Sequence, residues 1–192
     1  MSMTRAEPME TLRAWLAQAS GLGLRIPNAC VLSTVGLDGF PNARGVAIKD
    51  VTDGRVVVTG PLTSRKGREL AANPRCALTV WWDGPGRQVR IQGTAALLSA
   101  DEAGAIFAER SRESRLVAVV SRQGEPLHGD ELEVAYAALA ASGEDPGVPN
   151  SWGGWAITPH RVEFMEFSDE RFHSRTLFER DGSGWTVTAL QP

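Results

Sequence analysis

The chain has very little lysine. Only Lys49 and Lys66 among its twenty basic residues are lysines, and the other eighteen are arginines. Arginine therefore serves wherever a general positive charge is wanted, which makes the two lysines candidates for sites that admit a compact charge but not a wide planar guanidinium. The alternative is that an arginine-rich chain has kept two lysines by chance, and the residues around them have to decide.

Cysteine, long apolar runs and excess positive charge are also scarce. The two cysteines, Cys30 and Cys76, fall in apolar strand-like runs without metal-ligand spacing, which predicts buried thiols in a reducing cytoplasm. No stretch has the apolar length that crosses a membrane, and the N-terminal residues lack the apolar core of a signal peptide. The formal net charge of −3 argues against a protein that coats nucleic acid. We therefore expect a cytoplasmic protein with neither a membrane nor a nucleic-acid partner.

Helix and strand patterns fill what we expect to be a single domain of 192 residues, which is long enough to bury a core. The N-terminal part, residues 1–22, holds a helix opened by Pro8, and Ser99 with Glu102 forms a capping box that starts another helix at 99–110. We also expect helices at 64–73 and 130–142, a loop at 143–150, and strands at 29–35, 40–49, 56–59, 76–82, 88–98, 155–158, 161–167, 171–179 and 185–190. Many antiparallel strands with short turns and a few helices predict a mainly β fold with helices (α+β), a β-barrel with helical decoration.

The sharpest local signal of functional chemistry is the segment 171–175, Arg-Phe-His-Ser-Arg. Alternate side chains of a strand share one face, so Arg171, His173 and Arg175 would point together. Two guanidiniums and an imidazole on one face suit an anion or an aromatic ring. The alternative is a polar, solvent-facing strand whose arginines are balanced by nearby carboxylates.

Two other segments have the chemistry of phosphate sites. Ser64, Arg65 and Lys66 stand at the start of a predicted helix, where backbone N–H groups, a hydroxyl and two charges favour a phosphate. Arg110 and Ser114 follow another predicted helix and offer similar groups. An ordinary helix cap or a mixed-charge helix surface would explain either segment alone, so the number and order of these signals matter more than any one of them.

Taken in order, these segments resemble the pyridoxamine 5′-phosphate oxidase family of FMN enzymes. The resemblance runs from about Pro8 to Pro192, nearly the whole chain. The segments that carry it are 27–29 (Pro-Asn-Ala), 44–49, 64–66 (Ser-Arg-Lys), 87–89 (Arg-Gln-Val), Arg110 with Ser114, 120–123 (Val-Ser-Arg-Gln), 151–154 (Ser-Trp-Gly-Gly), 171–175 and the ending 190–192 (Leu-Gln-Pro). The resemblance implies an FMN-binding split β-barrel with antiparallel, Greek-key-like strands.

The resemblance also implies which residues bind FMN. Arg44, Arg65 and Lys66 would hold its phosphate. The residues expected along the flavin and its ribityl chain are Val46, Ile48, Lys49, Val58, Thr59, Ser64, Gln88, Gln123, Gly124, Met165 and Arg175. Met165 stands where the family usually has a tryptophan, and its thioether can still cover the flavin with apolar surface.

A phosphorylated pyridine vitamer is the substrate that the resemblance implies. Lys49, Arg110 and Ser114 would grip its 5′-phosphate, so that both lysines of the chain fall on phosphate sites. Arg171 and His173 are the candidate catalytic residues, which would orient the substrate C4′ carbon over the flavin and ease the loss of its amine or hydroxyl proton.

The implied reaction is the oxidation of pyridoxamine or pyridoxine 5′-phosphate to pyridoxal 5′-phosphate, with O₂ as acceptor and hydrogen peroxide as product. The family resemblance further implies a homodimer that binds each FMN between its subunits. The cofactor would carry the redox chemistry, while the protein supplies position, charge and exclusion of water.

Two other functions stay open. Related flavin oxidases of phenazine pathways oxidise reduced aromatic acids, and Ile106, where the family usually has a tyrosine at the substrate phosphate, leaves room for them, as does Met165. By the same resemblance, the loop at 60–63 is one residue longer than is usual in the family. A flavin-binding protein without turnover is the third possibility, and the presence of both Arg171 and His173 argues against it.

Overall fold

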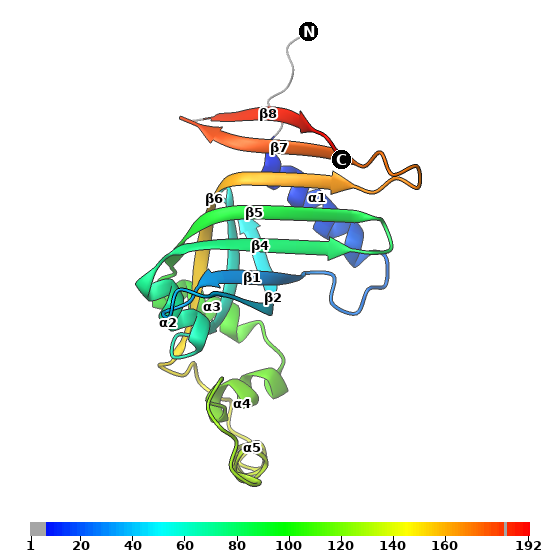
Figure 1. Cartoon of the computed structure of the whole chain (residues 1–192). Helices are drawn as coiled ribbons and strands as arrows, with labels where there is room; N and C mark the ends of the chain where they lie inside the picture. Colours follow the sequence, from blue (N-terminus) through cyan, green and yellow to red (C-terminus); the bar gives the residue numbers. More distant parts are fainter. Residues whose placement is uncertain (1–6, 183) are drawn as a thin grey trace.

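Residues 7–182 and 184–192, which the computed structural model describes, form eight strands and five helices (Figure 1). The strands are Ala29–Val35 (β1), Pro41–Thr52 (β2), Arg55–Pro61 (β3), Arg75–Trp82 (β4), Arg87–Leu97 (β5), Trp152–Glu166 (β6), Ser174–Asp181 (β7) and Gly184–Leu190 (β8). The helices are Pro8–Ser20 (α1), Arg65–Ala72 (α2), Ala100–Ala108 (α3), Arg112–Val120 (α4) and Glu131–Ala141 (α5). Residues 1–6 of the predicted N-terminal segment lie outside the described residues.

The strands pair antiparallel in the order β3-β2-β1-β4-β5-β6-β7-β8, and a further pairing of β3 with β6 closes the first six into a barrel. Strands β7 and β8 continue the sheet beyond β6, and α4 and α5 extend away from the opposite end of the barrel (Figure 1). The predicted mainly β barrel with helices is confirmed.

Alternation of side chains along the strands builds the core. In β4, Cys76, Leu78, Val80 and Trp82 are buried, while Trp81 between the last two is 60% exposed. Since successive side chains of a strand point to opposite faces, this pattern places one face of β4 inside the barrel and the other outside. Each buried leucine or valine side chain stabilises the fold by about 1.5–3 kcal/mol relative to exposure.

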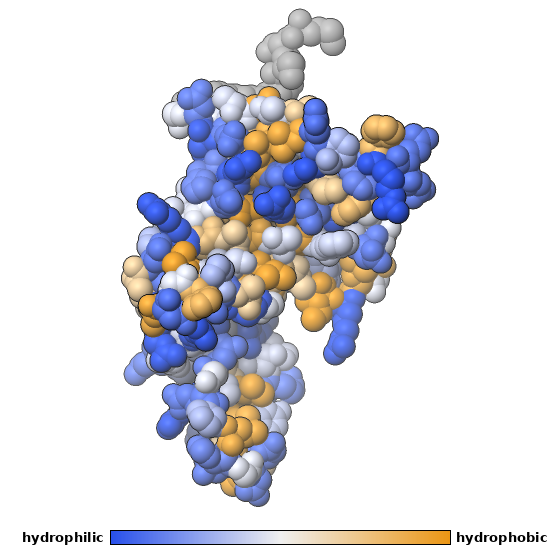
Figure 2. All heavy atoms as spheres, viewed as in Figure 1, coloured by the Kyte–Doolittle hydropathy of each residue, from blue (hydrophilic) through white to orange (hydrophobic). Residues whose placement is uncertain are grey.

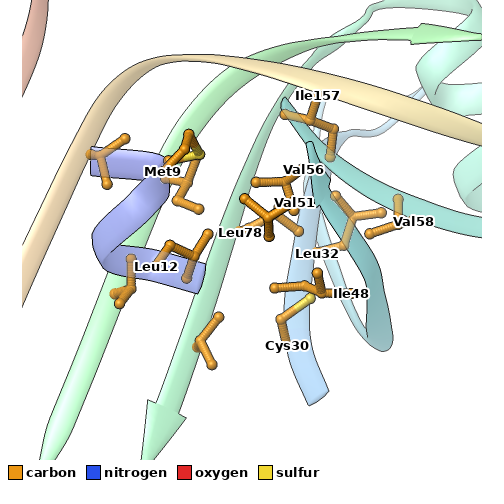
Figure 3. Close-up of a cluster of buried hydrophobic side chains, with 14 of the residues drawn as sticks. Met9, Leu12, Cys30, Leu32, Ile48, Val51, Val56, Val58, Leu78 and Ile157 are labelled. Atoms are coloured by element: carbon orange, nitrogen blue, oxygen red, sulfur yellow. The ribbon is translucent and has the colours of Figure 1, made fainter. Parts of the chain in front are cut away.

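Helix α1 contributes its apolar face to the same core. Met9 and Leu12 lie beside the barrel side chains in Figure 3, and both are buried. Trp15 packs edge-to-face on Trp82 and on Phe164, with ring centroids 6.3 and 5.1 Å apart. Pro8 at the start of α1 favours the helix there because its missing N–H has no intrahelical partner to lose.

Large apolar side chains also remain on the surface. Figure 2 shows apolar residues gathered in the middle of the face over β4 and β5. Trp81 stacks on the ring of Phe167 at 5.6 Å between centroids, and Phe172 is 79% exposed. Exposed apolar surface of this kind is typical of faces that bind another protein, a ligand or a membrane. No helix in the described part of the chain has the length and apolar character to cross a membrane.

Two predicted strands, 155–158 and 161–167, are one strand in the structure. Proline normally ends a strand because it cannot donate to the ladder. Here β6 continues through Pro159 because the register against β5 shifts: Pro159 faces Gly93 and Arg161 faces Gln92, which leaves His160 as an extra, unpaired residue. This β-bulge accommodates the extra residue, so that the strand continues past the proline.

The prediction that Arg171, His173 and Arg175 share one face of a strand is wrong. Strand β7 begins only at Ser174, and Arg171 has a left-handed φ of 68° in a turn where its N–H donates to the carbonyl of Ser168. That backbone conformation cannot belong to a strand. Helix α4 is a second difference, because the segment from Arg112 was not predicted to be helical.

Candidate active site

A cleft of about 400 Å³ lies between β2 and β3 on one side and α2 and α4 on the other. Four basic side chains line the cleft, from Arg44, Lys49, Lys66 and Arg110. None of the described lining residues is acidic. Both lysines of the chain therefore reach the same cleft. Positive charge without lining carboxylates favours an anionic ligand.

Lys66 is a buried cation, only 6% exposed. Its Nζ donates hydrogen bonds to Ser64 Oγ at 3.1 Å and to Gln123 Oε1 at 2.6 Å, and it forms no salt bridge within the described residues. Burial, and next the charge of Arg44, lower the pKa of Lys66 to about 8. A Cβ at Gly60 would lie 2.8 Å from Lys66 Nζ, so glycine at this position gives the lysine its space.

Glu69, in the second turn of α2, is a carboxylate with no solvent exposure. Its oxygens accept hydrogen bonds from Thr34 (2.6 Å), Asn42 (2.6 Å), Arg44 (2.8 Å) and Arg65 (2.9 Å). Burial alone would raise the pKa of this carboxyl group, but the hydrogen bonds from Thr34, Arg65 and Arg44 outweigh it and lower the pKa. The sequence analysis missed Glu69, for which the one signal was its i,i+4 spacing from Arg65.

The start of α2 completes a site for an anion. Ser64 caps the helix by accepting a hydrogen bond from the Gly67 N–H at 3.4 Å. The N–H groups of a first helical turn carry partial positive charge and attract phosphates. We call Arg44, Arg65, Lys66 and this first turn the anion cradle.

Arg110 forms a second cationic group at the cleft together with Lys49. Its guanidinium lies 4.6 Å from the centroid of the Trp152 ring and donates to the carbonyl of Ser114 at 3.1 Å. Burial, and then the charge of Arg110, lower the pKa of Lys49, while Glu109 acts in the opposite direction. The hydroxyl of Ser114 bonds to that of Ser111 at 3.1 Å in the cap of α4.

The cleft also collects some, but not all, of the other predicted residues. Val46, Thr59 and Gln123 line it. Ile48 and Val58 are 3% and 1% exposed, and their side chains belong to the barrel core. Ile106 does not line the cleft, and Gly124 follows Gln123 in the adjoining loop with a φ of 93°.

The remaining predicted residues form a second group at the far end of β6. Gln88, Met165 and Arg175 stand in register across β5, β6 and β7. Arg175 donates to the buried carboxylate of Glu163 at 2.6 Å and to the carbonyl of Gln191 at 3.2 Å.

His173 lies near this second group, in the segment before β7. Its Nδ1 accepts a hydrogen bond from the backbone N–H of Ser168 at 3.0 Å, and its ring meets the edge of Phe167 at 5.1 Å. In the neutral imidazole, this bond leaves the proton on Nε2, which is then a donor. Arg171 is exposed in the turn beside it.

One chain does not bring the two groups together. Thr59, in the cleft, pairs with Gly154 of β6, whereas Gln88 pairs with Met165, eleven residues further along the same strand. Eleven strand residues span on the order of 30 Å. We call the residues that line the cleft the first half-site, and Gln88, Arg171, His173 and Arg175 the second half-site.

Comparison with known proteins agrees with this architecture. Residues 19–142 match the family described as pyridoxamine 5′-phosphate oxidase, and residues 152–192 match the pyridoxine 5′-phosphate oxidase C-terminal dimerisation region. The chain belongs to the pyridoxamine 5′-phosphate oxidase family. The predicted family is therefore confirmed, and the chain is a flavin-dependent oxidoreductase.

Individual relatives cover nearly the whole chain. The pyridoxine/pyridoxamine 5′-phosphate oxidase of Thermosynechococcus vestitus is 43% identical, over 97% of this chain and 89% of the relative. That of Gluconobacter oxydans is 39% identical, over 98% and 96%. Among solved structures, PhzG from Burkholderia lata in complex with tetrahydrophenazine-1-carboxylic acid has a TM-score of 0.93 at 34% identity, covering 98% of this chain and 94% of PhzG.

The cleft fits a flavin that carries a phosphate. Within the described residues, Thr59 Oγ1 and Arg110 Nε are buried without a hydrogen-bond partner. Lys66 has no carboxylate partner there, and no lining residue is acidic. Buried polar groups of this kind are normally satisfied, so a ligand with acceptor oxygens suits the cleft.

The depressed pKa of Lys66 predicts a pH dependence of stability. The pKa falls from 10.5 to about 8 on folding, so folding releases a proton between these pH values. The free energy of unfolding of the flavin-free protein should therefore rise with pH across this window. Lys66→Met should gain less stability over the same range, as measured by chemical denaturation at both ends of the window. The same pH dependence of stability in the two proteins would show that the lowered pKa of Lys66 is not its cause.

Proposed function

We propose that this protein is an FMN-dependent oxidase of pyridoxamine or pyridoxine 5′-phosphate, which forms pyridoxal 5′-phosphate and reduces O₂ to hydrogen peroxide. The observation that carries the proposal is the pair of cationic groups in one cleft, whose lining in the described part of the chain has no acidic residue. The anion cradle would hold the phosphate of FMN, and Lys49 with Arg110 would hold the phosphate of the substrate. Relatives at about 40% identity over the whole chain support the same activity.

Thr59, Gln123 and the anion cradle would hold FMN, which would supply the redox chemistry, the acceptance of a hydride and the transfer of its electrons to O₂. The protein's own task is to hold both reactants in contact and keep water out. Thr59 and Gln123, at the edge of the cradle, offer hydrogen-bonding groups for the rest of the flavin. Trp152 and Val117 add apolar walls to the cleft.

Arg110 and Lys49 give the substrate end of the cleft its specificity for phosphate. The Trp152 ring fixes the guanidinium of Arg110 from one side, and the Ser114 carbonyl fixes it from another. The unpartnered Nε of Arg110 remains for a ligand oxygen. A charge-assisted hydrogen bond to a phosphate is about twice as strong as a neutral one.

We infer a homodimer in which each active site combines the half-sites of two chains. The separation of the half-sites along β6, the match of residues 152–192 to a dimerisation region and the exposed Trp81 and Phe172 all support it. The partner would supply His173, whose Nε2 proton can orient the substrate at C4′. It would also supply Arg171, whose charge lowers the pKa of the substrate amine and favours its neutral, reactive form.

A phenazine-type oxidase is the second candidate. The structural match to PhzG of Burkholderia lata, solved with tetrahydrophenazine-1-carboxylic acid, is the observation that favours it. A carboxylate could also bind between Lys49 and Arg110. Two cations for one ligand group suit a doubly charged phosphate better than a singly charged carboxylate.

Substrate turnover separates these candidates. We expect the FMN-loaded protein to produce peroxide and aldehyde aerobically with pyridoxamine 5′-phosphate, and far less with unphosphorylated pyridoxamine. Turnover of a reduced phenazine carboxylic acid, without turnover of either phosphorylated vitamer, would replace the proposed substrate by that of the second candidate.

The two lysines provide a matched pair of variants. Lys49→Met should lower kcat/KM for pyridoxamine 5′-phosphate about ten- to hundredfold, mainly through KM, because one charged hydrogen bond to the phosphate is lost. Its FMN content should stay near that of the wild type. Lys66→Met should instead weaken FMN binding and leave the KM for the substrate near that of the wild type. Kinetics under FMN saturation and flavin absorbance measure both effects, and unchanged KM in Lys49→Met would remove Lys49 from the substrate site.

A further inference from the structure

We propose that Glu69 is a positioning residue for the anion cradle and that it sets the preference of this protein for a phosphorylated flavin over an unphosphorylated one. The inference rests on the proposed use of the cradle for the FMN phosphate. It assigns a ligand-binding role to a carboxylate that is fully buried and has no direct access to the cleft.

The two guanidiniums of the cradle come from different elements and meet at this carboxylate. Arg44 leaves β2 and donates to Oε2 of Glu69, and Arg65 leaves α2 and donates to Oε1. Thr34 donates to Oε2 and Asn42 to Oε1, both at 2.6 Å. Each carboxylate oxygen thus binds one guanidinium and one neutral donor, which fixes the orientation of the carboxylate and of both arginines.

Neither arginine is held by packing alone. The side chain of Arg65 is 58% exposed and that of Arg44 is 22% exposed. A long, exposed side chain loses rotamer freedom when it binds a ligand, and this loss weakens binding. Glu69 binds both side chains, and Asp38 also pairs with Arg65 at 3.3 Å. Because these contacts order the arginines during folding, FMN would bind a prearranged pair of cations.

The charge of Glu69 by itself has the opposite effect. A negative group beside a phosphate site repels the phosphate, so removal of the charge alone would tighten FMN binding. The positioning role therefore predicts weaker FMN binding when Glu69 is replaced, whereas charge repulsion alone predicts tighter binding. A purely structural carboxylate would change the binding of FMN and of riboflavin alike, since the two flavins differ in the phosphate.

The test compares the dissociation constants of FMN and riboflavin, measured by quenching of flavin fluorescence, in the wild type, Glu69→Gln and Glu69→Ala. Glu69→Gln keeps the side-chain volume and one acceptor oxygen. Asp145→Asn is the matched control, because it removes a carboxylate that pairs with another arginine, Arg115, at 2.8 Å.

We expect the FMN dissociation constant to rise about fivefold in Glu69→Gln and at least tenfold in Glu69→Ala, in line with the loss of hydrogen bonds between charged groups. The riboflavin constant should change less than twofold, and Asp145→Asn should leave both constants unchanged. If Glu69→Ala does not fold, Glu69→Gln decides alone. Equal losses for both flavins, unchanged FMN binding, or tighter FMN binding would each overturn the proposal.

A wild-type protein that binds FMN no better than riboflavin would instead contradict the proposed function, so the two failures are distinguishable.

A mutant cycle tests directly whether Glu69 acts on FMN binding through the two arginines. In an Arg44→Met, Arg65→Met background, Glu69→Gln should cause no further loss of FMN binding, because the groups that it positions are gone and only its repulsion of the phosphate remains to be removed. A full additional loss would show that Glu69 does not act through them.

Discussion

The gathering of positive charge in a cleft whose described lining has no acidic residue is the constraint on which the rest of this structure depends. Arg44, Lys49, Lys66 and Arg110 converge on one cleft whose described lining has no carboxylate. Buried charges that lack partners cost free energy. Glu69 offsets part of this cost from behind the cleft through its bonds to two arginines. An anionic ligand would offset the remainder, so that ligand binding would also stabilise the fold.

The barrel explains why such a protein would work as a dimer. Strand β6 pairs with β3 near the cleft and with β5 and β7 near the second half-site, so its own length keeps the two apart. A two-fold dimer places the same patch of each chain against the other, and one operation then completes two equal sites. Dimerisation in this account is a condition for activity rather than an addition to it.

Local patterns in the sequence predicted most of the secondary structure. The strand at 29–35 and the capping box of α3 are where the residues alone place them. The bulge that carries β6 through Pro159 depends on pairing with Gly93, far away in the sequence, and the left-handed turn at Arg171 has no local signal. Lys49 and Lys66 stood out because lysine is rare in the chain, and Arg110 because it follows a predicted helix beside Ser114, whereas Arg44 came only from the family resemblance. Glu69 was missed because its importance comes from partners on β1 and β2.

Complementation between two inactive variants tests most directly the central claim that each site is built from two chains. One chain carries Lys49→Met and Arg110→Met, and the other carries Arg171→Met and His173→Ala. Random mixing makes half of the dimers mixed, with one intact site each, so we predict recovery of about a quarter of wild-type activity. Mixed dimers that form but stay inactive would contradict the account.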